Sequence, residues 1–297
     1  MQNMDEIIQA AGQGEPARLV VAGAGGREVL KSVDQAQRQG MVKPLLIGDS
    51  QKIRKLAREL KLTVSPGQII AGKSDREISE IAVERLLTDQ DILMKGLVET
   101  SSLMKAVLAA KDRLLKRQLI SHIVLAEVPA VDRLLFISDG GVNIKPGIEE
   151  RTAIIQNAID AALELGWETP RVALMAAVEK VRSSMPATEE AAILSKMADR
   201  GQISGGVVEG PFALDNALFQ DAAEIKGLTG KVAGQADILI TPDIVSGNLL
   251  GKSVVYLAGG CFAAFIGGTT RPIIVTSRAD KAETRLASLA VAALMSG

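Results

Sequence analysis

The amino-acid sequence predicts an α/β protein in which parallel or mixed sheets are flanked by helices. Short β-branched or aliphatic runs alternate with longer stretches of helical periodicity along the chain. Alternation of this kind is typical of βαβ units built around parallel sheets. Hydrophobic residues make up 47% of the chain and aromatic residues only 2%, so we expect an aliphatic core.

The first third of the chain contains four short apolar runs that predict strands. These runs are residues 18–22, 44–47, 69–70 and 92–95. Helices are predicted between them, over a segment that ends near residue 39 and over residues 51–60 and 75–87. Gly23, Gly25 and Gly26 follow the first strand, but their spacing differs from the GxGxxG of a dinucleotide-binding loop. A Rossmann cofactor is therefore not expected.

The rest of the chain continues the alternation after one interruption. Two strands at 122–126 and 133–137 follow each other directly, with a tight connection. Further strands are predicted at 172–175, 206–208, 238–240 and 273–275. Helices are predicted from Pro146 to about residue 165, over 188–199, 212–223 and 247–258, and from the last strand nearly to the end of the chain.

The interruption at 122–137 indicates a domain boundary. The final strand and helix, residues 271–297, are expected to return to the first lobe. We therefore predict a discontinuous first lobe of residues 1–117 and 264–297, and an inserted second lobe of residues 118–263. A cleft is expected between the two lobes.

Composition excludes several classes of function. The chain of 297 residues suits about two domains, and its net charge of −1 favours neither nucleic acid nor a membrane as partner. One histidine and one cysteine are too few for a conventional zinc site, and no metal is expected. No run approaches the roughly 18 apolar residues of a membrane span, and the N-terminus is unlike a secretory signal, so we expect a cytoplasmic protein. Cys261 is expected to be buried and His122 to be structural.

The segment Thr276-Ser277-Arg278 is the first candidate site. It follows a predicted parallel strand and precedes a predicted helix, where ligands of α/β sheets collect and where free N–H groups attract anions. Ser277 as a simple helix cap is the alternative. Capping does not explain Arg278, because the helix dipole disfavours a cation there, so the segment predicts an anion site.

Other predicted strand ends carry polar or glycine residues. Their candidate substrate-binding residues are Asp139, Asn143, Gly210, Pro211, Asp243 and Gly247, and Asn248 lies in the same region as Asp243. The alternative for 239–254 is a surface turn with a solvated lysine, Lys252. Four such strand ends together favour a binding site over ordinary turns.

These motifs resemble the phosphate acyltransferases that exchange acyl groups between coenzyme A and phosphate, and most closely their phosphate butyryltransferase branch. The similar segments are 95–108, 139–147, 185–218, 227–248 and 271–280, in order through about two-thirds of the chain. The resemblance implies a fold similar to isocitrate and isopropylmalate dehydrogenases. It also implies a homodimer or larger homo-oligomer, and the second lobe is the expected dimer contact.

The resemblance also implies roles for individual residues. Ser277 and Arg278 would bind the phosphate, with Thr276 beside them. Lys105 stands where the family has an arginine, so it keeps the charge but loses the planar fork. The acetyl branch has an aspartate at the position of Thr284, and that role is not transferred. Asp280 is expected to orient the guanidinium instead.

The function expected from this resemblance is acyl transfer from acyl-CoA to phosphate by direct attack in a ternary complex. Ser277, Arg278, Lys105 and Asn248 would be catalytic, with Asn248 steadying the oxyanion. Coenzyme A would be a substrate or product, and no permanently bound cofactor is expected. The alternatives are an acetyl- or propionyltransferase, a metal-dependent hydroxyacid dehydrogenase on the same scaffold, and a non-catalytic CoA-binding regulator.

Overall fold

The computed structural model describes residues 1–277 and 280–297, and the chain divides into two compact units. The terminal unit consists of Met4–Lys116 and Ala263–Gly297. The middle unit consists of Met1–Asn3 and Arg117–Phe262. In each unit a sheet is flanked by helices, which confirms the predicted α/β class.

The sheet of the terminal unit has the order β3-β2-β1-β4-β11-β10. Its first five strands are parallel, and β10 runs antiparallel to β11. The strands are β1 (Ala17–Ala22), β2 (Val42–Gly48), β3 (Ile69–Ala71), β4 (Ile92–Lys95), β10 (Cys261–Gly267) and β11 (Ile273–Ile274). The central strands β1 and β4 are buried almost throughout, as expected for parallel strands covered on both faces.

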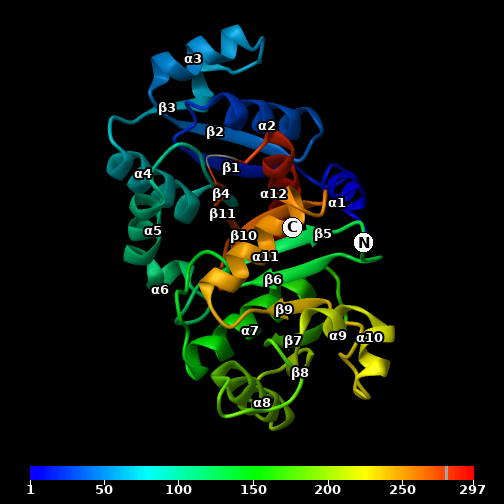
Figure 1. Cartoon of the computed structure of the whole chain (residues 1–297). Helices are drawn as coiled ribbons and strands as arrows, with labels where there is room; N and C mark the ends of the chain where they lie inside the picture. The colour runs from blue at the N-terminus through cyan, green and yellow to red at the C-terminus, as the bar shows by residue number, and fades with distance from the viewer. Residues whose placement is uncertain (278–279) are drawn as a thin grey trace. The chain divides into compact units, whose positions relative to one another are not determined.

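The helices of the terminal unit are α1 (Met4–Ala11), α2 (Arg27–Arg38), α3 (Ser50–Glu59), α4 (Asp75–Thr88), α5 (Thr100–Ala109), α6 (Lys111–Leu114) and α12 (Ala282–Met295), with a 3₁₀ turn at Pro66–Gln68. Local sequence explains where several begin. Asp49 caps α3 through the N–H groups of Gln51 and Lys52, and Ser74 caps α4. The helix α12 packs against α1 and α2 (Figure 1). Its apolar residues are therefore buried on most sides.

The sheet of the middle unit has the order β5-β6-β9-β7-β8. Its strands are β5 (Ser121–Glu127), β6 (Leu135–Ser138), β7 (Arg171–Met175), β8 (Val207–Phe212) and β9 (Ile238–Ile240). The strands β5 and β6 form the predicted consecutive pair and run antiparallel. The other pairings in this sheet are parallel, so the carboxyl ends of β6, β9 and β7 share one edge.

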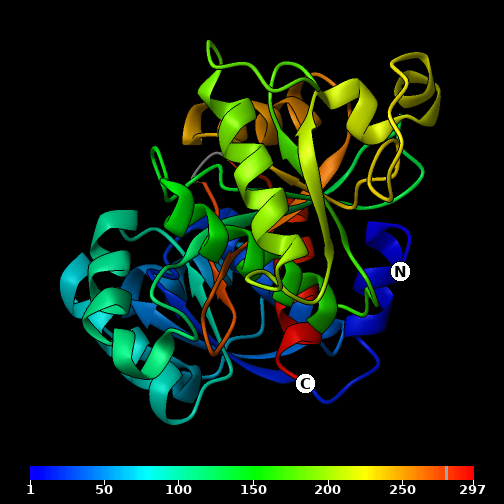
Figure 2. The ribbon, with the colours of Figure 1, turned by 90° about the horizontal axis from the view of Figure 1, so that it is seen from below.

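Five helices accompany this sheet. They are α7 (Ile148–Glu164), α8 (Pro186–Asp199), α9 (Leu214–Leu218), α10 (Gln220–Ile225) and α11 (Ile244–Tyr256). The yellow-green helix α8 runs alongside β8, which is visible from below in Figure 2. The single helix predicted over 212–223 is wrong, because Phe219 adopts an extended backbone and separates α9 from α10.

Two further expectations need correction. The segment around Cys261 belongs to β10, which the sequence did not reveal, and Cys261 is exposed rather than buried. Glu209, Gly210 and Pro211 do not end a strand, because β8 continues through them to Phe212. In both segments small residues weaken the hydrophobic alternation that would mark a strand.

Within the described residues, 1–277 and 280–297, none of the helices is long and apolar enough to cross a membrane. The same residues contain no group of three or more His, Cys, Asp or Glu side chains arranged to hold a metal ion.

Candidate active site

The carboxyl ends of three neighbouring parallel strands define one candidate region in the terminal unit. Ala22 of β1 pairs with Lys95 of β4, and Met94 of β4 pairs with Ile274 of β11. The strands are followed by the Gly23 loop, by Gly96 and by Thr276-Ser277. Carboxyl ends of parallel strands are the usual binding edge of an α/β sheet.

Close packing at this edge depends on a glycine. A Cβ atom on Gly96 would lie 2.2 Å from the carbonyl oxygen of Gly23, so no larger residue fits between the two strand ends. Lys95 ends β4 with only 2% of its surface exposed. Lys95 was not among the residues predicted for the site, although a lysine at the end of a buried apolar run was a signal for it.

Arg285 of α12 holds the backbone and side chain that follow β11. Its Nη1 donates to Thr276 Oγ1 at 2.6 Å, and its Nη2 donates to the carbonyl oxygen of Ser277 at 2.8 Å. Arg285 is 3% exposed and Thr276 is also 3% exposed, while Ser277 is exposed. Burial lowers the pKa of Arg285 from its ordinary value, and the charges of Asp280 and Glu28 oppose that shift. Arg285 therefore holds the segment Thr276-Ser277, which is predicted to bind phosphate, through two hydrogen bonds.

Arg285 was not among the residues predicted for the site. A lone arginine in a mainly apolar helix was the available signal, because a charge on a buried helix face needs partners. The arginine that the sequence did select, Arg278, lies outside the described residues. Asp280 accepts a hydrogen bond from the Ser277 N–H at 2.6 Å.

The alternative of Ser277 as a helix cap is wrong. The helix α12 begins at Ala282, and its N-cap residue is Lys281. The dipole of α12 acts within its first turn, which begins at Ala282, so it does not account for an anion beside Ser277. Two observations still support a binding site here: the position at the end of a strand, and the buried Arg285 that holds the segment.

A second candidate region lies in the middle unit, at the carboxyl end of β6. The carboxylate of Asp139 accepts hydrogen bonds from the N–H groups of Gly141 and Val142 at 2.7 and 2.9 Å. It also accepts from the backbone and the side-chain amide of Asn143, at 3.2 and 2.6 Å. Asp139 is 3% exposed. Asp139 and Asn143 thus organise the loop after β6.

The loop after β6 contacts the start of α11, which follows β9. A Cβ atom on Gly247 would lie 2.3 Å from the carbonyl oxygen of Asp139, so this approach requires glycine. Asn248 is exposed, and its Nδ2 donates to the carbonyl oxygen of Gly140 at 3.0 Å. The structure therefore brings together Asp139, Asn143, Gly247 and Asn248.

Asp243 caps the helix α11. Its Oδ1 accepts from the Ser246 N–H at 2.8 Å. This backbone hydrogen bond is the main cause that lowers the pKa of Asp243, and the charge of Arg151 contributes. Arg151 is 3% exposed and pairs with Glu190 at 3.0 Å. Burial lowers the pKa of Arg151, and Glu190 and Asp243 oppose the shift.

The remaining candidates belong to other elements, α5 and β8. Gly210 sits within β8, where a Cβ atom would lie 2.7 Å from Leu174 Cβ, and Pro211 is buried beside it. Lys105 lies on the exposed side of α5. Gly210 and Pro211 thus lie inside a strand, and the side chain of Lys105 is exposed.

Each unit has an α/β fold with polar residues at strand ends. Comparison with known proteins identifies the family to which the chain belongs. The chain matches the family model described as "Phosphate acetyl/butaryl transferase" over residues 3–90 and 80–293. It is 38% identical to the phosphate butyryltransferase of Clostridium beijerinckii over 295 residues, covering 99% of this chain and 98% of that protein. It is 42% identical to the phosphate acetyltransferase of Rhizobium meliloti over 291 residues, covering 98% and 92%. The chain belongs to this family and is an enzyme, a phosphate acyltransferase.

Solved structures agree with this assignment. A branched-chain phosphotransacylase from Enterococcus faecalis superposes with a TM-score of 0.82 at 27% identity, covering 94% of this chain and 99% of that one. A 4-hydroxythreonine-4-phosphate dehydrogenase from Klebsiella pneumoniae superposes with a TM-score of 0.57 at 12% identity, covering 95% and 100%. The second likeness concerns the fold alone, and it confirms the predicted dehydrogenase-like α/β architecture.

Proposed function

We propose that the enzyme transfers a short acyl group, with butyryl as the preferred group, between coenzyme A and inorganic phosphate. The observation that carries this proposal is similarity over nearly the whole chain to proteins named phosphate butyryltransferase and phosphate acetyltransferase. The strand-end segment at Thr276 and Ser277, fixed by the buried Arg285, supports it as a place for phosphate.

The proposed reaction is one direct displacement in a ternary complex. A phosphate oxygen attacks the carbonyl carbon of the thioester, the C–S bond breaks, and coenzyme A leaves as a thiolate that takes up a proton. Simple thiols have a pKa of about 8.5, so the thiolate is a competent leaving group without an obligatory acid. Positioning of the two substrates can supply roughly 7–11 kcal/mol of the barrier reduction.

The proposed roles follow from charge and position. Ser277 and Arg278, with Thr276 beside them, bind the phosphate. Lys105 supplies a second positive charge to the substrates. The side chain of Asn248 steadies the oxyanion with the N–H that it does not donate to Gly140.

Acetyl transfer is the second candidate reaction. The 42% identity to a phosphate acetyltransferase exceeds the 38% identity to a phosphate butyryltransferase. One methylene changes binding by only about 1–3 kcal/mol, so family motifs do not distinguish the two substrates. A panel of acyl-CoA substrates decides between them.

The test is phosphate-dependent release of thiol from acetyl-, propionyl-, butyryl- and hexanoyl-CoA by the purified full chain. We expect turnover only with phosphate present, with a higher kcat/KM for butyryl-CoA than for acetyl- or propionyl-CoA. Arg278→Ala should lower kcat/KM at least about 100-fold, because a charge-assisted phosphate contact is lost. Arg76→Ala is the matched control, since its guanidinium forms an exposed pair with Glu80 on α4. Folded protein that releases no thiol from any of the four substrates would refute the proposal.

A further inference from the structure

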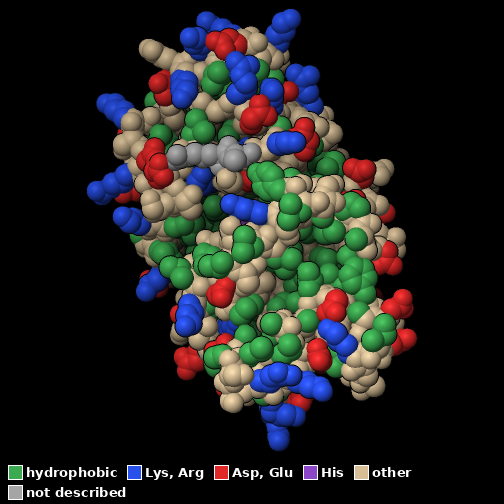
Figure 3. Space-filling model, in the orientation of Figure 1, with side chains coloured by type: hydrophobic (Ala, Val, Ile, Leu, Met, Phe, Trp, Pro, Cys, Tyr) green, Lys and Arg blue, Asp and Glu red, His purple; other side chains and the backbone are tan. Residues whose placement is uncertain are grey.

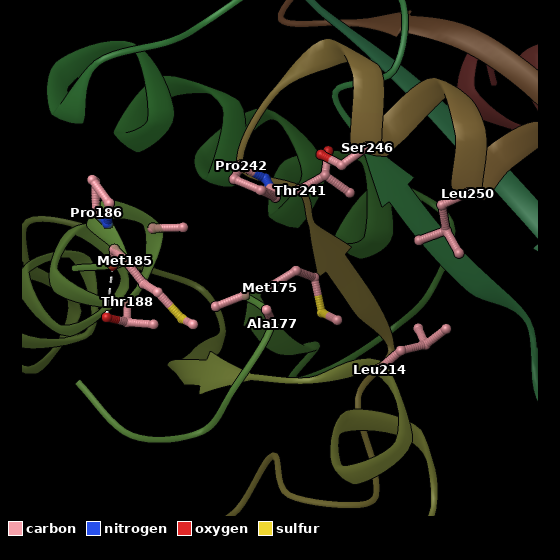
Figure 4. Close-up of a pocket in the computed structure, with 12 residues that line it drawn as sticks. Met175, Ala177, Met185, Pro186, Thr188, Leu214, Thr241, Pro242, Ser246 and Leu250 are labelled. Atoms are coloured by element: carbon pink, nitrogen blue, oxygen red, sulfur yellow. Dashed lines mark hydrogen bonds between the residues drawn. The ribbon is translucent and has the colours of Figure 1, made fainter. Parts of the chain in front are cut away.

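An apolar pocket of about 540 Å³ lies in the middle unit, at the binding edge of its sheet. Met175 ends β7, Thr241 follows β9, and Met185 and Thr188 come from the start of α8. Figure 4 shows these side chains around one space, with Leu250 of α11 on the far side and Met185 extending toward Met175. A volume of this size suits a small organic ligand.

The wall of this pocket offers a ligand little hydrogen bonding. Its three hydroxyl groups belong to Thr188, Thr241 and Ser246, and each donates to a carbonyl oxygen of the chain, at 2.8, 3.3 and 2.9 Å. A hydroxyl has one hydrogen to donate, so these hydrogens are already used. The residues lining the pocket, all within the described chain, include no Lys, Arg, Asp or Glu. Such a wall favours hydrocarbon.

We propose that this pocket binds the acyl chain of the acyl-CoA substrate, an inference that rests on the proposed function. Acyl-CoA has three chemically distinct parts. The nucleotide carries phosphates that need cations, and the pantetheine arm carries two amides that need hydrogen-bond partners. The acyl chain needs neither, and it alone matches a wall of methionine, leucine and satisfied hydroxyl groups.

A second apolar cavity of about 550 Å³ in the same unit provides a contrast. It is lined by Leu135, Ile137 and Leu239 on the sheet and by Phe219 and Val254 from the helical side. Hydrophobic side chains gather over the region of α9 and α11 on the face shown in Figure 3. This cavity lies along the strands β6 and β9 and contains none of the residues that follow their carboxyl ends. Strand-end position therefore selects the first pocket for substrate.

The two methionines affect the length of the acyl chain that the pocket can hold. An unbranched thioether side chain adjusts its shape easily, so Met175 and Met185 can pack against chains of different length. The pocket should then accept chains longer than butyryl. Each methylene that it buries should tighten binding about fourfold.

The experiment measures the binding of acetyl-, butyryl-, hexanoyl- and octanoyl-CoA to the full chain by calorimetry, without phosphate. We expect the Kd to fall about fourfold per methylene from acetyl to hexanoyl. Ala187→Leu, in α8, and Ala177→Leu, after β7, each enlarge a side chain in the pocket wall. Each should weaken hexanoyl- and octanoyl-CoA at least about tenfold and leave acetyl-CoA within twofold. Ala258→Leu, in the second cavity, is the matched control and should keep the wild-type dependence on chain length.

The outcomes separate this inference from the proposed reaction. A wild-type Kd that does not depend on chain length would overturn the pocket assignment, and so would folded Ala187→Leu and Ala177→Leu variants with unchanged dependence. A dependence abolished by Ala258→Leu instead would assign the acyl chain to the second cavity. Chain-length-dependent binding without any phosphate-dependent thiol release would support the pocket and refute the proposed reaction.

Discussion

The strand ends of the two units use polar side chains in opposite ways. In the middle unit, the carboxylate of Asp139 is buried and accepts four hydrogen bonds from its own loop. In the terminal unit, the segment Thr276-Ser277 is held by Arg285 from the helix α12. One loop organises itself, whereas the other is held by a side chain of the helix that follows it.

The difference shows which strand-end residues are free to contact a substrate. A side chain that accepts four internal hydrogen bonds has little capacity left for a ligand, so Asp139 acts mainly on loop geometry. In the terminal unit Arg285 supplies the loop geometry, and Ser277 remains exposed. We therefore expect a mutation of Asp139 to affect stability and mutations around Ser277 to affect catalysis.

The largest effect is expected for Asp139→Ala. Removing the carboxylate leaves part-buried N–H groups of the loop without an acceptor, and each unsatisfied group costs up to about 1–3 kcal/mol. We expect the free energy of unfolding to fall by about 3 kcal/mol, measured by urea denaturation. Asp132→Ala is the control, because that side chain is 93% exposed and its ion pair contributes little. Equal stability of the two variants would contradict the structural role of Asp139.

A smaller effect, on catalysis, is expected for Arg285→Lys. Lysine keeps the charge but cannot donate to Thr276 Oγ1 and to the Ser277 carbonyl oxygen in the same planar geometry. Displacement of the segment should lower kcat/KM roughly 10- to 100-fold. The KM for phosphate should rise more than the KM for acyl-CoA.

Arg151→Lys is the matched control for that prediction. Arg151 is also 3% exposed, but it lies in the middle unit and pairs with Glu190. We expect it to lower stability without raising the KM for phosphate. If both variants lost stability and neither changed the KM for phosphate, Arg285 would be structural rather than a positioning residue.

The smallest effect is expected for the cap of α11. Asp243→Ala should cost about 1 kcal/mol of stability at pH 7, because Ser246 loses its N-cap acceptor. The hydrogen bond lowers the pKa of Asp243 below its ordinary value of 3.8, so the stabilisation is present above that pH. It disappears as the pH falls through the lower pKa of the folded state.

The difference in unfolding midpoint between wild type and Asp243→Ala should therefore shrink when the pH is lowered from 5 to 3. Asp243→Asn keeps an acceptor that does not titrate, and it should lose only a few tenths of a kcal/mol at pH 7. A difference for Asp243→Ala that stays constant with pH would show that the carboxylate charge does not contribute.

Local sequence predicted the regular elements well where the periodicity was strong. The parallel strands β1, β4 and β9, the pair β5 and β6, and the helices α4, α7 and α8 all lie close to their predicted positions. The strand β10 was missed because its small residues, Ala263 and Ala264 among them, carry little strand propensity. The break at Phe219 was missed because an extended residue between two helices leaves no mark in apolar spacing.

The sequence by itself determined the α/β class, most of the regular elements and the family, because hydrophobic periodicity and contiguous motifs are local properties of the chain. Tertiary structure alone decided that Arg285 holds Thr276 and Ser277, and that the segments after β7 and β9 enclose an apolar pocket with the start of α8. These contacts join residues from separate elements, and their partners depend on how the elements pack. Spacing along the chain does not contain that information.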